Sequence, residues 1–358
     1  MIEPRNHFIQ DLLISEKLDA LLIFGLPNIR YLCGFTGTDG VLLIQANSSV
    51  FLTDSRYVAQ AQKQVNADHI ICYKNRLKTV ADKLISSGCK RVGFDADVMS
   101  VALFEELNAL TTDSLNWYPL SLQLQPLRGV KTAVELISLQ SAANLNHQAF
   151  DLVLPLIRPG ITEREIALEL EFALKRLGGE SNAFDFIVAS GVRGALPHGV
   201  ASDKKLLPGE LVTLDFGTRI DGYHSDETVT LAIGGVDRKL RQIYDIVLEA
   251  HDSALAAIQP GMMICDLDAV ARDYIASKDY GEFFGHSLGH GVGLEVHEYP
   301  AVSARSDQRL IEGMVITVEP GIYMPDIGGV RIEDTVVVTG DGFEALTSIP
   351  KRFKQLGI

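Results

Sequence analysis

The residues that could do chemistry gather between His198 and Glu333, a stretch that holds six of the nine histidines. Four carboxylates and one imidazole lie there in or beside short apolar, β-branched segments, namely Asp215, Asp226, His290, Glu319 and Glu333. This hard donor set suits Mn, Co or Fe and accommodates Zn. Its formal charge of about −4 would neutralise two divalent cations, which together can activate a water and polarise a carbonyl or phosphoryl group. The composition predicts a dimetal hydrolytic site.

The two aspartates belong to a predicted hairpin. Segments 211–218 and 223–233 are apolar and β-branched, and an Asp-Gly dipeptide separates them, which is a strong hairpin signal. A turn at that dipeptide places Asp215 opposite Thr228. Because side chains alternate with period two, Asp226 falls on the same face as Asp215, diagonal to it. Two such carboxylates would repel each other unless a cation lay between them.

The two glutamates belong to a second predicted hairpin. Segments 314–322 and 329–338 both read as strands, and folding about the loop between them places Glu319 opposite Glu333. Arg331 shares that face, because it lies two residues from Glu333. The second pair of carboxylates therefore also requires a counter-charge.

The remaining donor, His290, lies within Gly289–Gly293, where three glycines let the backbone approach a ligand closely. Taken singly, such residues more often have a structural role than a functional one. A lone Asp in a strand is usually an edge or turn residue, and a lone His is usually a hydrogen-bonded core residue, which is the interpretation given to His224 and His251. The metal interpretation depends on all five donors converging.

With these motifs in place, the chain resembles the pita-bread metallopeptidases, which include Xaa-Pro aminopeptidases, Xaa-Pro dipeptidases (prolidases) and methionine aminopeptidases. The resemblance covers residues 130–358 and depends on an Asp, a second Asp eleven residues on, a His within His-Gly-Xaa-Gly, and two later Glu residues. It implies two bound divalent ions, with manganese favoured over Co, Zn or Fe. The implied metal ligands are Asp215, Asp226, His290, Glu319 and Glu333.

The resemblance also implies roles beyond metal binding. It implies Glu319 as the general base, and His198 and His297 as catalytic contacts to the substrate and the tetrahedral intermediate. The implied substrate-binding residues are His198, His286, His297, Arg331 and Tyr323. One departure is visible, because many members carry Arg in a Ser-Asp-Xaa-Thr-Arg-Thr motif where this chain has Val229, which puts local contacts there in doubt.

The first part of the chain predicts a separate α/β domain over residues 1–125, since helical and strand patterns alternate there. Segments 28–40 and 52–57 resemble the N-terminal domain of creatinases and Xaa-Pro peptidases. Methionine aminopeptidases usually lack this domain, so its presence favours proline specificity. A linker is expected at 126–131, followed by an α+β pita-bread catalytic domain over residues 130–358.

The net charge and the cysteine content limit the partners and the compartment that we expect for this chain. The net charge of −14 and pI near 5.1 disfavour nucleic acid and anionic membranes as partners. The four cysteines lack Cys-Xaa-Xaa-Cys spacing, which favours reduced thiols and a cytoplasmic protein. Neither a signal peptide nor a membrane-spanning segment is expected.

We therefore expect an Xaa-Pro aminopeptidase that acts on peptides with proline at the second position, as a homodimer by resemblance. The alternative is an Xaa-Pro dipeptidase, which must recognise a free carboxylate, most simply with Arg331 or Arg305. Some prolidases carry an Arg just after the His-Glu-Xaa-Pro segment, where this chain has 301–303, Ala-Val-Ser, and this favours the aminopeptidase. A non-catalytic binding module or a metal-independent amidinohydrolase on the same fold would each predict missing ligand residues.

Overall fold

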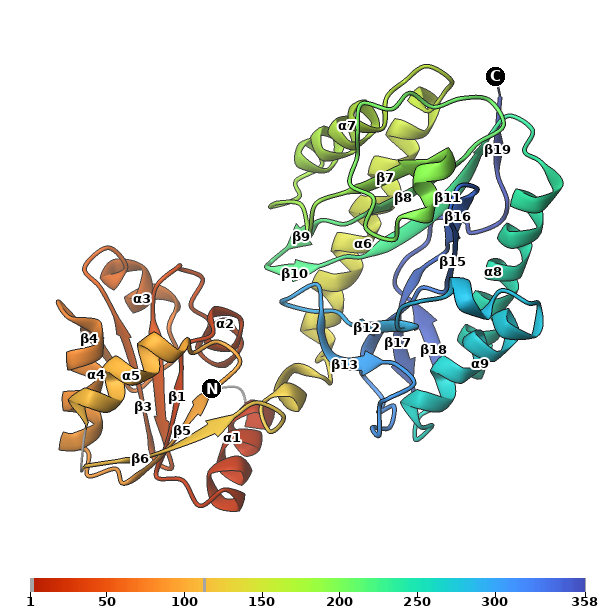
Figure 1. Ribbon diagram of the computed structural model, residues 1–358. Coiled ribbons are helices and arrows are strands. Elements are labelled where there is room, and N and C mark those ends of the chain that lie inside the picture. Colours follow the sequence, from red (N-terminus) through yellow and green to blue (C-terminus); the bar gives the residue numbers. More distant parts are fainter. Residues whose placement is uncertain (1–2, 112–113, 358) are drawn as a thin grey trace. The chain divides into compact units, whose positions relative to one another are not determined.

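The chain forms two compact units that divide between Leu127 and Arg128, inside the segment expected to be the linker. The computed structural model describes residues 3–111 and 114–357. Figure 1 shows the chain coloured along its sequence, with the first unit in red to yellow and the second in yellow to blue. Each unit has its own hydrophobic core.

The first unit is a six-stranded mixed sheet covered by helices. The strand order is β4 (His69–Cys72), β3 (Ser48–Thr53), β2 (Val41–Gln45), β1 (Ala20–Ile23), β5 (Arg91–Asp95) and β6 (Asn116–Leu120). The helices are α1 (Glu3–Ser15), α2 (Leu26–Cys33), α3 (Val58–Gln64), α4 (Arg76–Ser86) and α5 (Val101–Leu110). Apolar residues of α4 and α5 pack against one face of this sheet.

In this unit, one helix cap follows from the local sequence, whereas one helix does not. Ser100 caps α5 as its position predicts, because its hydroxyl accepts a hydrogen bond from the backbone nitrogen of Leu103 at 3.2 Å. Helix α2 was not predicted. The buried Asp95 carboxylate accepts hydrogen bonds from the backbone nitrogens of Phe24 and Gly25 just before α2, and this long-range contact has no sequence signal.

The second unit places two helix pairs around several short sheets (Figure 1). Its helices are α6 (Ala133–Val153), α7 (Glu163–Arg176), α8 (Arg238–Ala257) and α9 (Ile264–Ser277). One sheet has the order β19 (Gln355–Leu356), β11 (Glu227–Ile233), β8 (Leu211–Phe216) and β7 (Ile187–Ser190). Another has the order β13 (Glu298–Val302), β12 (Gly289–Gly291), β14 (Val315–Val318), β17 (Asp334–Thr339) and β18 (Gly342–Ala345).

Two hairpins complete this unit, β9 (Arg219–Ile220) with β10 (Tyr223–His224), and β15 (Gly321–Met324) with β16 (Gly328–Arg331). Helices α6 and α7 share a hydrophobic core with β7, β8 and β11. Helices α8 and α9 share another with β14 to β17. The strands that carry the candidate site therefore lie between two helical layers.

The predicted register of the first hairpin is confirmed, although its continuity is not. Thr228 pairs with Asp215 in the β8–β11 ladder, and both turn residues, Asp221 and Gly222, have positive φ angles of 47° and 73°, as a type I′ turn requires. The ladder breaks between β8 and β9, where the Ser225 hydroxyl instead accepts a hydrogen bond from the Thr218 nitrogen at 2.9 Å. The expected pair of long strands is thus two short ladders.

The second hairpin behaves in the same way. Val318 pairs with Asp334 in the β14–β17 ladder, and Gly321 pairs with Arg331 in the β15–β16 ladder. Both ladders keep one register, and the break between them falls at Glu319 and Glu333. The predicted opposition of these glutamates is therefore kept, although the two ladders belong to separate sheets.

The sequence Thr162-Glu163-Arg164-Glu165 predicts a helix that begins with a capping box, and helix α7 confirms it. The Thr162 hydroxyl accepts a hydrogen bond from the Glu165 nitrogen at 3.1 Å, and the Glu165 carboxylate accepts one from the Thr162 nitrogen at 2.8 Å. The apolar spacing of this helix predicts that Leu168 is buried, but its side chain is 43% exposed. Across residues 3–111 and 114–357, no helix combines the length and apolar character needed to cross a membrane.

We predict that Gly217→Ala destabilises the second unit by about 2 kcal/mol or more, because overpacked sites force the backbone to move. A Cβ atom at Gly217 would lie 1.9 Å from the Ser225 carbonyl oxygen, which is backbone and cannot rotate away. The free energy of unfolding from urea titration measures this. The control is Gly235→Ala, whose Cβ meets nothing within 4 Å. Equal stability of the two variants would contradict the prediction.

Candidate active site

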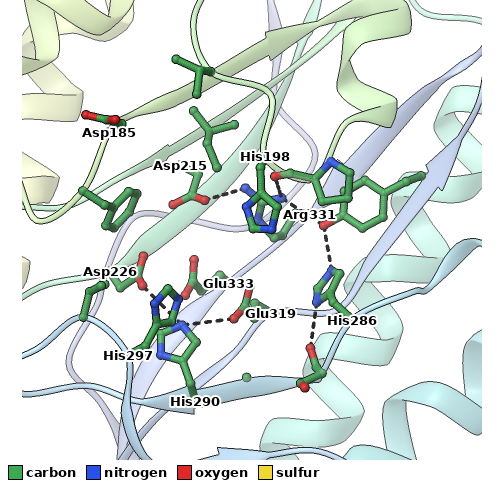
Figure 2. Close-up of a pocket in the computed structure, with 18 of the residues that line it drawn as sticks. Asp185, His198, Asp215, Asp226, His286, His290, His297, Glu319, Arg331 and Glu333 are labelled. Atoms are coloured by element: carbon green, nitrogen blue, oxygen red, sulfur yellow. Dashed lines mark hydrogen bonds and ion pairs between the residues drawn. The ribbon is translucent and has the colours of Figure 1, made fainter. Parts of the chain in front are cut away.

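The five predicted metal-binding residues converge at the breaks in the strands. Asp215 lies in β8 and His290 in β12, Asp226 precedes β11, Glu319 follows β14, and Glu333 precedes β17. Figure 2 shows their side chains turned toward one shared space. All five line a single cavity of about 530 Å³. These residues lie in or beside five different strands, so the tertiary fold is needed to bring all of them together.

Backbone hydrogen bonds at the strand breaks hold these segments together. The Glu319 nitrogen donates to the Leu288 carbonyl at 2.8 Å, which ties β14 to the segment that carries His290. The Glu333 nitrogen donates to the Thr228 carbonyl at 3.2 Å, which ties β17 to the strand after Asp226. The breaks therefore free backbone groups that join the pieces of the site.

The His290 ring is oriented with one nitrogen toward the carboxylates. Its Nδ1 donates to the Gly291 carbonyl at 3.1 Å, so Nε2 faces Glu319 Oε1 at 3.3 Å and Asp226 Oδ2 at 3.6 Å. A backbone partner on one ring nitrogen is the usual arrangement when the other binds a metal. Ligand atoms of Asp226, His290 and Glu333 all lie within 4.8 Å of one another.

The buried carboxylates repel one another and lack some hydrogen-bond partners, and bound cations would compensate for both. Burial, together with repulsion between neighbouring carboxylates, raises the pKa of Asp226 and of Glu333 well above their ordinary values. Asp215 Oδ1 and Glu333 Oε1 are buried, and within the described residues neither has a hydrogen-bond partner. Unpaired anionic oxygens beside a correctly oriented imidazole fit hard divalent cations. The residues present thus fit a divalent metal site.

Glu319 differs electrostatically from the other glutamate. Burial opposes its ionisation, yet the hydrogen bond and charge of His290, with His286 and Arg331, lower its pKa. The Thr317 hydroxyl also donates to Glu319 Oε1 at 3.3 Å. Glu319 is therefore the carboxylate most readily kept ionised.

Arg331 is held by the protein itself. It is 3% exposed, and its Nη2 donates to Asp215 Oδ2 at 2.5 Å. Its remaining nitrogens donate to the Thr228 hydroxyl, the Pro197 carbonyl and the Tyr323 hydroxyl at 3.0–3.2 Å. Its contact with substrate stays a prediction, and this guanidinium already holds Asp215 in place.

A hydrogen-bond relay continues from Arg331 to His286. The Tyr323 hydroxyl accepts from Arg331 and lies 2.9 Å from His286 Nε2. His286 Nδ1 donates to the Ser287 carbonyl at 2.8 Å, and burial lowers the pKa of His286. The neutral ring therefore accepts the Tyr323 hydrogen at Nε2. Burial also raises the pKa of Tyr323 to about 12, which keeps this hydroxyl protonated.

His198 and His297 stand at the more open side of the cavity. Both side chains are exposed and line it, and Figure 2 shows them beside the carboxylate cluster. The ring centroids of His290 and His297 are 4.2 Å apart. Burial and the neighbouring His290 lower the pKa of His297, which favours a neutral ring. The structure thus brings together every predicted site residue.

Sequence reasoning missed some of the cavity wall. Phe184 and Asp185, just before β7, line the cavity, as do Val200 and Val296. Asp185 is exposed. No motif singles these residues out, since each lies in irregular chain between elements.

Sequence reasoning also missed a charged cluster behind the ligands. Lys351 is buried and pairs with Glu227 and Asp334, each of which neighbours a predicted ligand in the chain. His251 lies 3.3 Å from the Asp334 carboxylate, which agrees with its interpretation as a buried, partnered residue. Val229 is 2% exposed in the core beneath α7, so apolar side chains surround the position where many family members carry arginine.

His224 is also a hydrogen-bonded structural residue, as the sequence predicts. It pairs in β10, and its Nδ1 lies 3.1 Å from the Gly293 carbonyl. It does not line the cavity within the described residues. It is a structural contact of the loop that carries His297.

Comparisons with known proteins agree with this site. The model of Metallopeptidase family M24 matches residues 138–340, and the model of the Creatinase/Prolidase N-terminal domain matches residues 5–130. An Xaa-Pro dipeptidase of Pyrococcus horikoshii is 38% identical over 336 residues, which cover 93% of each chain.

Two solved structures extend this similarity. The Xaa-Pro dipeptidase from Bacillus anthracis is 42% identical with a TM-score of 0.96, and the alignment covers 99% of each chain. The X-Pro aminopeptidase from Thermotoga maritima is 37% identical with a TM-score of 0.89, covering 98% of this chain and 99% of that chain. The similarity therefore spans both units.

We predict that the metal-free protein loses stability as pH rises from about 5 to about 8. A carboxyl whose folded-state pKa is raised stabilises the fold below its unfolded pKa of about 4, and this contribution is lost as pH rises through the folded value. Asp226 and Glu333 both have raised pKa values. The loss is at most about 1.4 kcal/mol per pH unit for each titrating carboxyl.

Urea denaturation after treatment with chelator measures this effect. Asp226→Asn should flatten the pH dependence because it removes one buried carboxyl, and added divalent metal should restore stability at pH 8. A metal-free protein that is equally stable at both ends of the range would refute the prediction.

Proposed function

We propose that this chain, which belongs to metallopeptidase family M24, hydrolyses the peptide bond that precedes proline at the amino end of a peptide. The resemblance expected from the motifs is confirmed, and so is the two-part fold of a creatinase-like N-terminal domain and a pita-bread domain. The chain is a metallo-exopeptidase. Because every predicted site residue lies in the second unit, we assign the chemistry to that unit.

The observation that carries the proposal is the joining of four carboxylates, His290 and two further histidines around one cavity. A structural cluster would leave fewer buried oxygens unpaired, whereas Asp215 Oδ1 and Glu333 Oε1 have no partner among the described residues. Both the dipeptidase and the aminopeptidase among the similar proteins act, by name, on bonds involving proline.

Membership of the family implies divalent metals. We assign their binding to Asp215, Asp226, His290, Glu319 and Glu333, and we favour manganese, with cobalt, zinc or iron as alternatives. When bound, such ions would lower the pKa of a water nucleophile and polarise the scissile carbonyl.

Glu319 is our assignment for the general base. Its lowered pKa keeps it ionised at neutral pH, so it can take a proton from the attacking water. It then gives that proton to the leaving nitrogen as the C–N bond breaks. Proline leaves as a secondary amine, and its nitrogen carries no hydrogen in the peptide bond, so the site needs to deliver one proton there.

We assign to His198 and His297 the donation of hydrogen bonds to the carbonyl oxygen. Both line the cavity, and the lowered pKa of His297 favours a neutral ring with one N–H to donate. Donors aimed at the oxygen where charge develops stabilise the transition state. This assignment gives each histidine a role that does not require it to change charge.

The next question is whether the protein acts as an aminopeptidase or as a dipeptidase. An aminopeptidase leaves the residues after proline outside the cavity, whereas a dipeptidase must recognise the proline carboxylate. Arg331 is committed to Asp215 and Tyr323, and Arg305 is exposed and, among the described residues, does not line the cavity. The absence of a free guanidinium in the described cavity favours the aminopeptidase. The names of the similar dipeptidases favour the second candidate.

Two further assignments belong with this function. Cys33, Cys72, Cys89 and Cys265 are all free thiols, which supports a reducing compartment such as the cytoplasm. We propose a homodimer on the strength of the family resemblance, with peptides as the partners that the site recognises.

The test is hydrolysis of an Xaa-Pro dipeptide, its carboxamide and an Xaa-Pro-Yaa tripeptide, with manganese and with chelator. We expect all three to be cleaved and the chelator to stop cleavage. If a carboxylate is recognised, kcat/KM for the carboxamide should fall by about 100-fold or more, because one partner of a charged hydrogen bond is lost. Cleavage of the dipeptide alone would establish the dipeptidase, and no cleavage of any would end the proline assignment.

We predict that Glu319→Gln lowers kcat by at least about 10²-fold, since general acid–base catalysis contributes about that much, while the fold remains intact by circular dichroism. Steady-state kinetics at saturating metal separates this from weaker metal binding. Glu344→Gln, on an exposed edge strand, is the matched control and should keep wild-type kcat. Full activity of Glu319→Gln would remove Glu319 from the base role.

A further inference from the structure

Glu298, the residue after His297, takes part in a buried ion-pair cluster. Lys131 Nζ lies 2.6 Å from Glu298 Oε1, and Arg128 Nε lies 3.1 Å from Glu298 Oε2. The exposed fractions of these side chains are 1% for Lys131, 12% for Arg128 and 4% for Glu298. Surface ion pairs hold little geometry, but a desolvated pair with several hydrogen bonds does.

The cationic side of this cluster is fixed to the second unit. Lys131 Nζ also donates to the Arg128 carbonyl at 2.8 Å and to the Gly129 carbonyl at 3.4 Å. The Lys131 nitrogen donates to the Gly313 carbonyl at 2.8 Å, and Val130 forms an isolated bridge with Met314. The first residues of the unit are therefore anchored beside the start of β14.

On the anionic side, the cluster spans the loop that carries His297. Arg128 pairs with Glu295 as well as with Glu298, so one guanidinium joins two points of the loop. A Cβ atom at Gly293 would lie 2.1 Å from Glu298 Oε1, which shows that the carboxylate passes directly over the beginning of the loop. The Glu298 carboxylate, at one end of the loop, therefore lies against Gly293 at the other end.

Among the described residues, few contacts fix the ring of His297. Within the described residues, no hydrogen bond reaches its ring, and its one ring contact is the T-shaped contact with His290. The β12–β13 register also shifts between His290 and Gly291, next to this loop. The direction of the His297 side chain thus depends on the backbone that Glu298 anchors.

We propose that Lys131 and Arg128 are positioning residues for His297 and act on it through Glu298. This inference rests on the proposed function only for the catalytic role of His297. The pair holds the loop so that the imidazole faces the reacting carbonyl. Small displacements of such a group can cost up to about 100-fold in rate, even though neither cation touches the substrate.

The test is a double-mutant cycle on kcat at saturating metal. Lys131→Met should lower kcat about tenfold in the wild-type background but less than about twofold in the His297→Ala background, because contacts that act through one residue are non-additive. Metal affinity by calorimetry should change by less than about twofold. An equal loss of kcat in both backgrounds, or a loss of metal affinity that accounts for it, would overturn the proposal.

Lys204→Met is the matched control. Lys204 Nζ also lies 2.6 Å from a carboxylate, that of Glu210, and donates to the Ser190 hydroxyl and the Lys205 carbonyl, but none of these three partners is next to His297 in the chain. Any effect of Lys204→Met should be the same factor in both backgrounds. If Lys131→Met fails to fold, Glu298→Gln keeps the size and the acceptor while removing the charge, and the same non-additivity with His297→Ala is required of it.

A second readout separates this proposal from the function itself. If the wild type cleaves no proline substrate, the proposed function fails, and the positioning is then read from the His297 ring. Its Cε1–H resonance, identified in the zinc-loaded protein by its loss in His297→Ala, should shift in Lys131→Met and stay in place in Lys204→Met. An unshifted resonance in Lys131→Met would overturn the proposal.

Discussion

Repulsion between buried carboxylates is the constraint on which the second unit depends. Four of them share one cavity, and each carboxylate that loses water needs a compensating partner. The protein supplies fewer partners than full compensation requires, because Asp215 Oδ1 and Glu333 Oε1 lack one among the described residues. We infer that the oxygens left without a partner would favour the binding of cations, since a fully satisfied cluster would gain little from binding them.

The partners that do exist determine which oxygens stay free. Arg331 takes one oxygen of Asp215, and the Thr228 hydroxyl donates to one oxygen of Glu333 at 2.6 Å. His290 keeps Glu319 ionised. Behind the cavity, Lys351 joins Glu227 to Asp334 and so links the strands that follow Asp226 and Glu333. The contacts to Asp215 and Glu333 each hold one carboxylate oxygen and leave the other without a partner among the described residues.

The sequence could predict the pairing of the ligands because pairing depends on local signals. The Asp221-Gly222 turn and the period-two alternation set Asp215 opposite Thr228, and the second hairpin placed Glu319 opposite Glu333 in the same way. The strand breaks had no such signal, since they depend on hydrogen bonds to Leu288 and Thr228 from distant segments. The Lys131–Glu298 pair, separated by 167 residues, is a purely tertiary contact of the same kind.

Arg331 shows why motif reasoning stops short of end selectivity. An arginine beside a carboxylate of the candidate site can bind a substrate carboxylate or hold the protein's own carboxylate, and the sequence is the same in both cases. Here its guanidinium holds Asp215, and its release would leave a buried carboxylate without its counter-charge. A dipeptidase on this scaffold would therefore need a hydrogen-bond donor other than Arg331, such as His198 in the cavity lining, to recognise the proline carboxylate. An aminopeptidase needs no such group, so the internal use of one arginine bears directly on which substrates the cavity can select.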